Sequence, residues 1–160
     1  MTGGSSTRVS RIIRAPRKAV YRACLDPDAL AIWRVPDNME GHMHAFDARE
    51  GGVFRMSLTY RDPQQSPGGK SSHDTDTFQG RFVELVPDEK IVEAIEFESR
   101  DPGFAGEMKI TTSLADAAGG TEVTVLCQDI PAGIRPEDNE TGCRQSLDKL
   151  ASLLESGKRR

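Results

Sequence analysis

The sequence predicts an α+β domain in which an antiparallel sheet packs against one long C-terminal helix. Short β-favouring segments follow one another between glycine and proline turns, and the chain closes with an apolar stripe at helical spacing. A third observation is the stretch 46–56, where a strand, the turn Gly51-Gly52 and a second strand follow in order. Glycine adopts positive φ without a steric penalty, so we expect a two-strand hairpin at this turn.

The first elements are a strand and two short helices. Residues 7–14 are β-favouring and predict an edge strand. Residues 15–25 predict a helix, because Pro16 is tolerated at a first helical position. Asp26 is a candidate N-cap for a second short helix, which ends before Pro36.

Six further strands follow in quick succession. We expect them near residues 40–48, 52–61, 74–86, 90–99, 106–115 and 120–129. Their connections are short and rich in Gly, Pro and Asp, which favours antiparallel neighbours. The longest connection, 61–73, is polar and predicts a mobile surface loop.

The last element is a predicted helix from about residue 135 to residue 154. Its apolar stripe consists of Cys143, Leu147, Leu150 and Leu154, which recur at intervals of four, three and four residues. Polar residues occupy the other faces of this helix. A long amphipathic helix that follows a run of antiparallel strands is expected to lie across their sheet.

Length and composition indicate one soluble domain. The 160 residues suit a single core, which we place at 7–155 with flexible tails at 1–6 and 156–160. Apolar residues make up 36% and charged residues 29% of the chain, and no stretch approaches the roughly 20 apolar residues of a membrane span. The start carries no apolar core of a secretory signal, so we expect a cytoplasmic protein without a membrane partner.

Charge and cysteine content argue against two other classes of protein. The net charge of −4 argues against a nucleic-acid partner, which would call for a basic face. The three cysteines, Cys24, Cys127 and Cys143, are odd in number and form no Cys-x-x-Cys pair. We therefore expect reduced, mostly buried thiols, and neither a disulfide framework nor a zinc site.

Several short motifs follow one another along the chain: Ala15-Pro16-x-x-x-Val20-Tyr21, Asp26-Pro27-x-x-Leu30-x-x-Trp33, Pro36, Asp47-x-Arg49-x-Gly51-Gly52-x-Phe54-Arg55, Phe78-x-Gly80-x-Phe82-x-Glu84-Leu85-x-Pro87 and Gly119-Gly120-Thr121. Their order and spacing resemble a known family, the activator-of-Hsp-90-ATPase homologues of the START-like, or SRPBCC, superfamily. The resemblance covers about residues 8–155. It implies the helix-grip fold, in which a curved antiparallel sheet wraps the C-terminal helix around a deep cavity, with two short helices after the first strand.

The closing helix departs from the family pattern at one position. In the family this helix often begins with glycine followed by tryptophan, whereas here Gly142 is followed by Cys143. A thiol in place of an indole leaves more room at a cavity-facing position. We therefore expect a relatively enlarged pocket.

Strand alternation combined with the implied fold gives a candidate lining for that pocket. Inward-facing positions are Phe54, Met56, Leu58, Phe78, Phe82, Ile95, Phe97, Met108, Ile110, Val123, Val125 and Cys127, opposite Cys143, Leu147 and Leu150. Trp33, near the implied cavity mouth, and Tyr60, which shares the parity of Leu58, complete the candidate set. The alternative is that these side chains fill a dry core.

Glu93 and two histidines are the polar candidates. Glu93 shares the parity of Ile95, so it is either a polar anchor or acid/base group in the pocket, or part of a bulge or exposed strand end. His42 and His44 share one face of their strand, and His44 is a candidate ligand contact. Nothing fixes a third ligand beside them, so no metal is expected.

Three functions remain open on this basis. The first is binding of a small hydrophobic or amphipathic molecule in the cavity, without a cofactor. The second is a cyclase- or hydrolase-type enzyme that uses Glu93 in the same cavity, although no catalytic signature occurs in the sequence. The third, which follows from the family name, is a chaperone ATPase-activating partner. Self-association as a homodimer is also left open.

Overall fold

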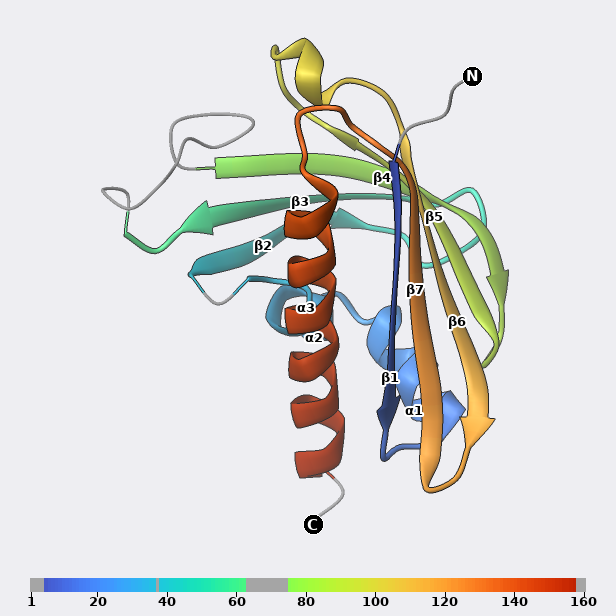
Figure 1. Cartoon of the computed structure of the whole chain (residues 1–160). Coiled ribbons are helices and arrows are strands. Elements are labelled where there is room, and N and C mark those ends of the chain that lie inside the picture. Colours follow the sequence, from blue (N-terminus) through green and yellow to red (C-terminus); the bar gives the residue numbers. More distant parts are fainter. Residues whose placement is uncertain (1–4, 37, 63–74, 158–160) are drawn as a thin grey trace.

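The computed structural model describes residues 5–36, 38–62 and 75–157 (Figure 1). In chain order its elements are β1 (Ser5–Ile13), α1 (Arg17–Cys24), α2 (Pro27–Trp33), β2 (Met39–Phe46), β3 (Val53–Tyr60), β4 (Thr75–Val86), β5 (Lys90–Phe97), the 3-10 turn η2 (Pro102–Phe104), β6 (Met108–Ala117), β7 (Gly120–Ile130) and α3 (Pro136–Gly157). The predicted order of elements is confirmed. The first strand begins at Ser5 and the last helix ends at Gly157. Most of the loop predicted at 61–73 lies outside the described residues, and so do positions 1–4 and 158–160 of the predicted tails.

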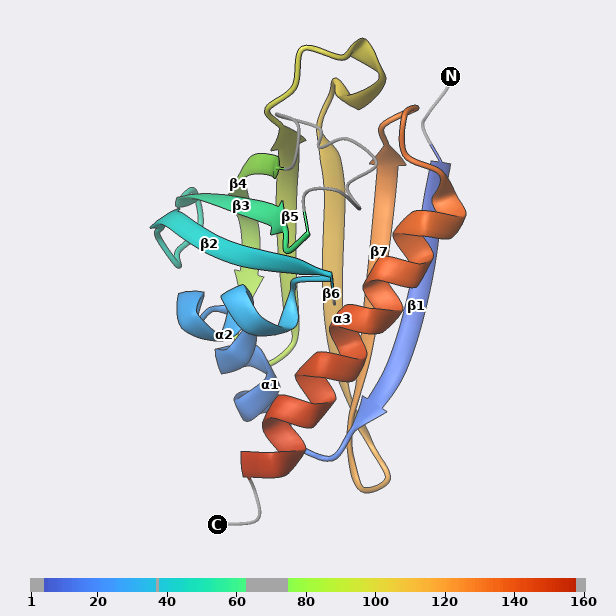
Figure 2. The same cartoon turned by 90° about the vertical axis from the view of Figure 1, so that its left-hand side faces the viewer.

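The strands form one antiparallel sheet in the order β1-β7-β6-β5-β4-β3-β2. The sheet is strongly twisted, so that β2, β3 and β4 run across the view of Figure 1 while β1, β6 and β7 run upright beside α3. Figure 2 shows α3 crossing in front of β7 and β1 on the concave side. This arrangement is the predicted helix-grip fold.

The glycine hairpin joins β2 to β3 as predicted, but its two glycines serve different purposes. Gly51 has φ +81°, which residues with a Cβ resist. Gly52 does not have a positive φ; instead, a Cβ at this position would lie 2.1 Å from the carbonyl oxygen of Asp47. The backbone therefore needs glycine here for close approach. Arg49 Nε donates to Asp47 Oδ2 at 2.7 Å across the turn.

The two short helices close the lower end of the fold. Pro16 is the N-cap of α1 and not its first helical residue, so this helix begins one residue later than proline chemistry alone suggests. Asp26 caps α2 as predicted, because its carboxylate accepts from the backbone N–H of Asp28 at 2.9 Å. The Trp33 indole N–H donates to the Ala23 carbonyl oxygen at 2.9 Å, which fastens α2 to α1.

The register of the sheet shifts at three places, one of them where Ser5 and Thr7 of β1 pair with β7; the other two are in β2 and β4. In β2 the register shifts between Met43 and Ala45, and in β4 it shifts between Phe82 and Glu84, opposite Glu93. A bulge inserts one extra residue, bends its strand and increases the local twist. The two strands that carry these bulges, β2 and β4, belong to the part of the sheet that runs across the view of Figure 1.

Candidate functional site

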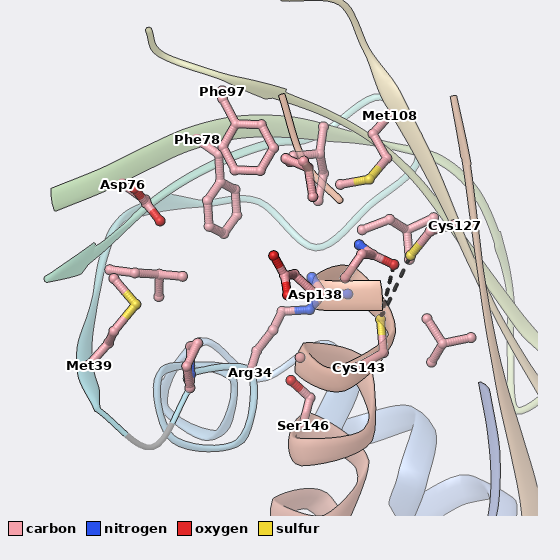
Figure 3. A pocket seen from close by; sticks show the side chains of 18 of the residues that line it. Arg34, Met39, Asp76, Phe78, Phe97, Met108, Cys127, Asp138, Cys143 and Ser146 are labelled. Carbon is pink, nitrogen blue, oxygen red and sulfur yellow. Dashed lines mark hydrogen bonds between the residues drawn. The ribbon is translucent and has the colours of Figure 1, made fainter. Parts of the chain in front are cut away.

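A cavity of about 330 Å³ lies between the sheet and the first half of α3 (Figure 3). Its sheet wall consists of inward-facing side chains from five strands: Leu58, Tyr60, Asp76, Phe78, Ile95, Phe97, Met108, Ile110, Thr112, Val125 and Cys127. The opposite wall comes from α2, the segment that leads from it into β2, and α3 with the loop before it: Trp33, Arg34, Pro36, Asn38, Met39, Ile134, Asp138, Asn139, Gly142, Cys143, Ser146 and Leu147. Most of the wall is apolar, with polar groups at separate points.

The cavity exists because α3 carries small or short side chains on its inward face over its first turns. Asn139, Gly142, Cys143 and Ser146 follow one another at spacings of three, one and three residues, which places them on one helix face. A Cβ added at Gly142 would meet no atom within 4 Å. Below Leu147 the same face is filled by larger buried side chains, so the space closes.

Arg34 brings a charge into the cavity wall. Its guanidinium makes a bidentate pair with Glu93, with Nη1 2.7 Å from Oε1 and Nη2 2.8 Å from Oε2. The Arg34 side chain is 18% exposed and the Glu93 side chain 4%. Burial by itself lowers the pKa of Arg34, but the adjacent Glu93 carboxylate outweighs it and keeps the guanidinium charged.

Other polar groups are spread over the wall. Asp76 on β4 is 5% exposed. The pKa of the Tyr60 phenol is raised, mainly by burial and to a smaller extent by the charge of Asp76. Asn139 and Ser146 present short polar side chains from α3, and Thr112 contributes a buried hydroxyl from β6. A ligand in this cavity would thus meet few polar groups on an apolar background.

Two cysteines face each other across the helix–sheet contact. Cys127 Sγ on β7 lies 3.8 Å from Cys143 Sγ on α3, and Cys143 Sγ lies 3.9 Å from Asn139 Oδ1 (Figure 3). The hydrogen bond from Cys143 lowers the pKa of Cys127 to about 7 against the opposing effect of burial, with help from Thr7, Asn139 and the charge of Arg34. The same contact and burial raise the pKa of Cys143.

The structure places many of the predicted site residues in this wall. They are Trp33, Tyr60, Phe78, Ile95, Phe97, Met108, Cys127, Cys143 and Leu147. Trp33 is 3% exposed, so it both covers the core and contributes to the cavity. Their contact with a ligand stays a prediction.

Phe54, Met56, Phe82 and Glu93 lie elsewhere. They surround a second, nearly filled space of about 10 Å³ next to the first. The rings of Phe54 and Phe82 are tilted toward each other by 44° with their centroids 5.1 Å apart, and the ring of Phe46 completes the cluster. Phe54, Met56 and Phe82 therefore pack a filled core, which was the alternative to their lining the cavity. Val123, 0% exposed, is also core and not cavity wall.

His44 lies on the opposite face of the sheet, so its prediction as a ligand contact in the cavity is wrong. Met43 points inward in this strand, and His42 and His44 therefore point outward. The His44 ring bonds to Ser57 Oγ at 2.7 Å and lies 4.6 Å from the His42 ring. Among the described residues no group of three metal-ligating side chains occurs.

The sequence interpretation did not single out several wall residues. Asn139, Gly142 and Ser146 could have been found by extending the stripe of Cys143 and Leu147 toward the N-terminus of α3. Arg34 carried no local signal, because its role depends on a partner 59 residues away in the chain. Met39 and Asn38 follow a short helix in a segment without periodicity.

A sheet that wraps one long helix around a side-chain-lined cavity defines the helix-grip class of START-like proteins. The family described as "Activator of Hsp90 ATPase homolog 1-like protein" matches residues 14–155, and the chain belongs to this family. No curated protein matched the chain. None of the described helices is long and apolar enough to cross a membrane.

Solved structures of similar proteins agree with the fold. Protein CV1439 from Chromobacterium violaceum is 36% identical, with a TM-score of 0.82 over 94% of this chain and 96% of that chain. An AHSA1-like protein from Aeromonas hydrophila is 19% identical, with a TM-score of 0.70 over 98% of this chain and 96% of that one. A protein from Staphylococcus epidermidis is 18% identical, with a TM-score of 0.74 over 98% and 93% of the two chains.

Proposed function

We propose that this protein binds a small apolar or amphipathic molecule in the cavity between the sheet and α3. The observation that carries this proposal is the cavity itself, about 330 Å³ in volume and enclosed mainly by apolar side chains. Ligand sites in proteins are concave, mostly apolar and of about 300–1,000 Å³. A volume near the lower end of that range favours a compact ligand over a long lipid chain.

Apolar contact supplies most of the binding energy in this proposal. At about 25 cal/mol per Å², burying roughly 200 Å² of apolar ligand surface contributes about 5 kcal/mol. Association costs part of that energy, so polar contacts have to add to it. Arg34, Asn139 and Ser146 are suited to orient a polar end of the ligand, because they line one side of the wall.

The first experiment is a native mass spectrum of protein purified without denaturation, which would reveal a small molecule retained in the cavity. The second is a titration with the apolar fluorophore N-phenyl-1-naphthylamine. We expect saturable binding, and we expect Cys143→Trp to weaken it at least about tenfold, because an indole occupies the space beside the thiol. His44→Trp, on the outer face of the sheet, is the matched control and should bind like the wild type.

Two outcomes would count against this proposal. One is the absence of saturable fluorophore binding together with a native mass equal to that of the bare chain. The other is equal fluorophore affinity for Cys143→Trp and His44→Trp, which would locate the binding outside the cavity.

The alternative functions receive less support from the structure. Glu93, the candidate acid/base group, has both carboxylate oxygens bonded to Arg34 and lies beside the small filled space instead of the cavity. A general acid or base has to reach the reacting atom. A chaperone-binding face calls for a contiguous exposed apolar patch. The large exposed apolar side chains among the described residues are spread over β1, α2, β3 and β4: Ile12, Ile32, Val53 and Val83.

A further inference from the structure

The thiol pair in the cavity wall offers a chemistry that simple ligand binding does not use. Cys127 and Cys143 come from different elements, β7 and α3, and their sulfur atoms lie 3.8 Å apart. A disulfide has an S–S distance of about 2.05 Å, so the sulfurs are in contact without being bonded. A movement of about 2 Å would join them, and no third metal-ligating residue accompanies them in the described chain.

The two thiols differ in the way that a nucleophile and its partner do. The neighbouring side chains of Cys143, Thr7 and Asn139 lower the pKa of Cys127 and so stabilise its thiolate, with the Cys143 sulfur in contact at 3.8 Å. The pKa of Cys143 is raised, so this residue keeps its proton while Cys127 loses one. The positive charge of Arg34, in the same wall, favours the thiolate form of both.

The surroundings of the pair select the kind of electrophile that reaches it. The cavity wall beside the sulfurs is apolar, with Met108, Ile110 and Val125 among its members. A small thiol-reactive molecule with an apolar body would be concentrated there, whereas a polar one would stay in water. The reaction that uses two neighbouring thiols is their oxidation to a disulfide.

We propose that Cys127 and Cys143 reduce organic hydroperoxides that bind in the cavity through an apolar group. This inference rests on the proposed ligand-binding function and names its substrate class. The polar end of such a substrate, a neutral –OOH group, also suits a wall whose guanidinium is already paired with a carboxylate.

The chemistry has two steps. The Cys127 thiolate attacks the terminal oxygen of R–O–OH, so that an S–O bond forms, the O–O bond breaks and RO⁻ leaves; RO⁻ takes from water the proton that the thiol had released and becomes ROH. Cys143 sulfur then attacks the Cys127 sulfenic acid, the S–S bond forms, and the hydroxyl leaves as water with the Cys143 proton. Two thiols are oxidised and one hydroperoxide is reduced, and a low-molecular-weight dithiol such as dithiothreitol regenerates the pair.

The test compares cumene hydroperoxide with hydrogen peroxide on reduced protein. We expect cumene hydroperoxide to be consumed at least about tenfold faster at equal concentration, because only its phenyl group gains from the apolar wall. Peptide mapping should find one disulfide, between Cys127 and Cys143. Cys127→Ser should lose consumption, while Cys143→Ser should stop at a sulfenic acid that dimedone traps on Cys127.

Cys24 gives the matched control within the same chain. It is buried outside the cavity, and burial raises its pKa to about 12. Cys24→Ala should therefore consume hydroperoxide at the wild-type rate. Thermal melting of each variant, followed by circular dichroism, separates a lost thiol from a lost fold.

Different results would overturn different parts of the inference. Fluorophore binding without any hydroperoxide consumption overturns the thiol chemistry and leaves the ligand-binding proposal standing. Equal consumption of the two peroxides overturns the substrate class, and if fluorophore binding is also absent the ligand-binding proposal falls with it. Dimedone labelling of Cys143 in Cys127→Ser, at the rate seen for Cys127, overturns the assigned roles.

Discussion

The two ends of the contact between α3 and the sheet differ in how they are filled. At the lower end Leu150 and Ala151 pack against α1 and β1, and Leu150, Val123 and Ile13 are each 0% exposed. At the upper end the same helix face presents Asn139, Gly142, Cys143 and Ser146 to a cavity of about 330 Å³. The C-terminal half of α3 thus packs in the core, and its N-terminal half borders the cavity.

This difference follows from side-chain volume along one helical stripe. Protein interiors are close-packed, and a space remains only where neighbouring side chains are too short to reach one another. The change from large to small residues occurs within one turn, at Leu147, which belongs to both regions. Stability and the proposed ligand binding would therefore depend on separate parts of α3 and could be altered separately.

The largest effect is expected at the closed end. Leu150→Ala should lower the free energy of unfolding by about 3 kcal/mol, because it removes a fully buried side chain and leaves a void. Urea denaturation measures this loss. Cys143→Ala, at the open end, should cost less than about 1 kcal/mol, since its side chain already borders the cavity. Equal losses of unfolding free energy in Leu150→Ala and Cys143→Ala would contradict the conclusion that only the lower part of α3 is closely packed.

The buried ion pair lies between the two regions and is expected to have the second-largest effect. Glu93→Gln should lower the free energy of unfolding by about 2–3 kcal/mol, because the buried Arg34 charge loses its counter-charge. Glu98→Gln is the matched control. Glu98 makes the same bidentate contact with Arg55, at 2.6 and 2.9 Å, but on the outer face of the sheet. An exposed pair contributes less than about 1 kcal/mol, so a loss as large for Glu98→Gln would refute this explanation.

Cys127 in the cavity wall and the buried Cys24 should differ in how their rates of alkylation depend on pH. The pKa of Cys127 is lowered to about 7, so iodoacetamide should modify it about tenfold more slowly for each pH unit below 7 and reach a plateau above pH 8. Cys24, whose pKa burial raises to about 12, should stay unmodified in the folded protein over this range. Peptide mapping after timed alkylation measures both. A Cys127 profile with a midpoint above 8 would show that its partners do not stabilise the thiolate.

The smallest effect concerns the glycine of the open end. Gly142→Leu should raise the free energy of unfolding by about 1 kcal/mol, because glycine is a poor helix former and the new side chain enters free space. It should also weaken fluorophore binding several-fold. Gly142→Ala gains the same helix propensity with little volume and should keep the wild-type affinity. If Gly142→Leu binds as well as Gly142→Ala, this part of the helix does not border the binding site.

Local chemistry predicted much of the fold. The cap at Asp26 and the hairpin at Gly51 each depend on neighbours a few residues apart. Strand parity also placed Phe78, Ile95 and Met108 on the inner face, where the structure has them. The order and spacing of the predicted helices and strands are enough to predict the fold class.

The site was less predictable, because strand parity does not say which inward-facing side chains pack on one another and which border the cavity. Phe54 and Phe82 share the inner face with Phe78, yet they pack on one another while Phe78 also reaches the cavity. His44 illustrates a second limit, since a shared face could be assigned but not its direction. Arg34 illustrates a third, because its position depends on Glu93 in a distant strand.

The Arg34–Glu93 pair also bears on which protonation state of a ligand this protein accepts. The guanidinium charge in the wall is already balanced, so a ligand anion placed beside it would add an uncompensated charge to a region poor in water. A weak acid would enter in its neutral form and take up a proton from solution as it binds. Its affinity would then fall as the pH rises above the acid's own pKa, although the Arg34 guanidinium beside it stays charged.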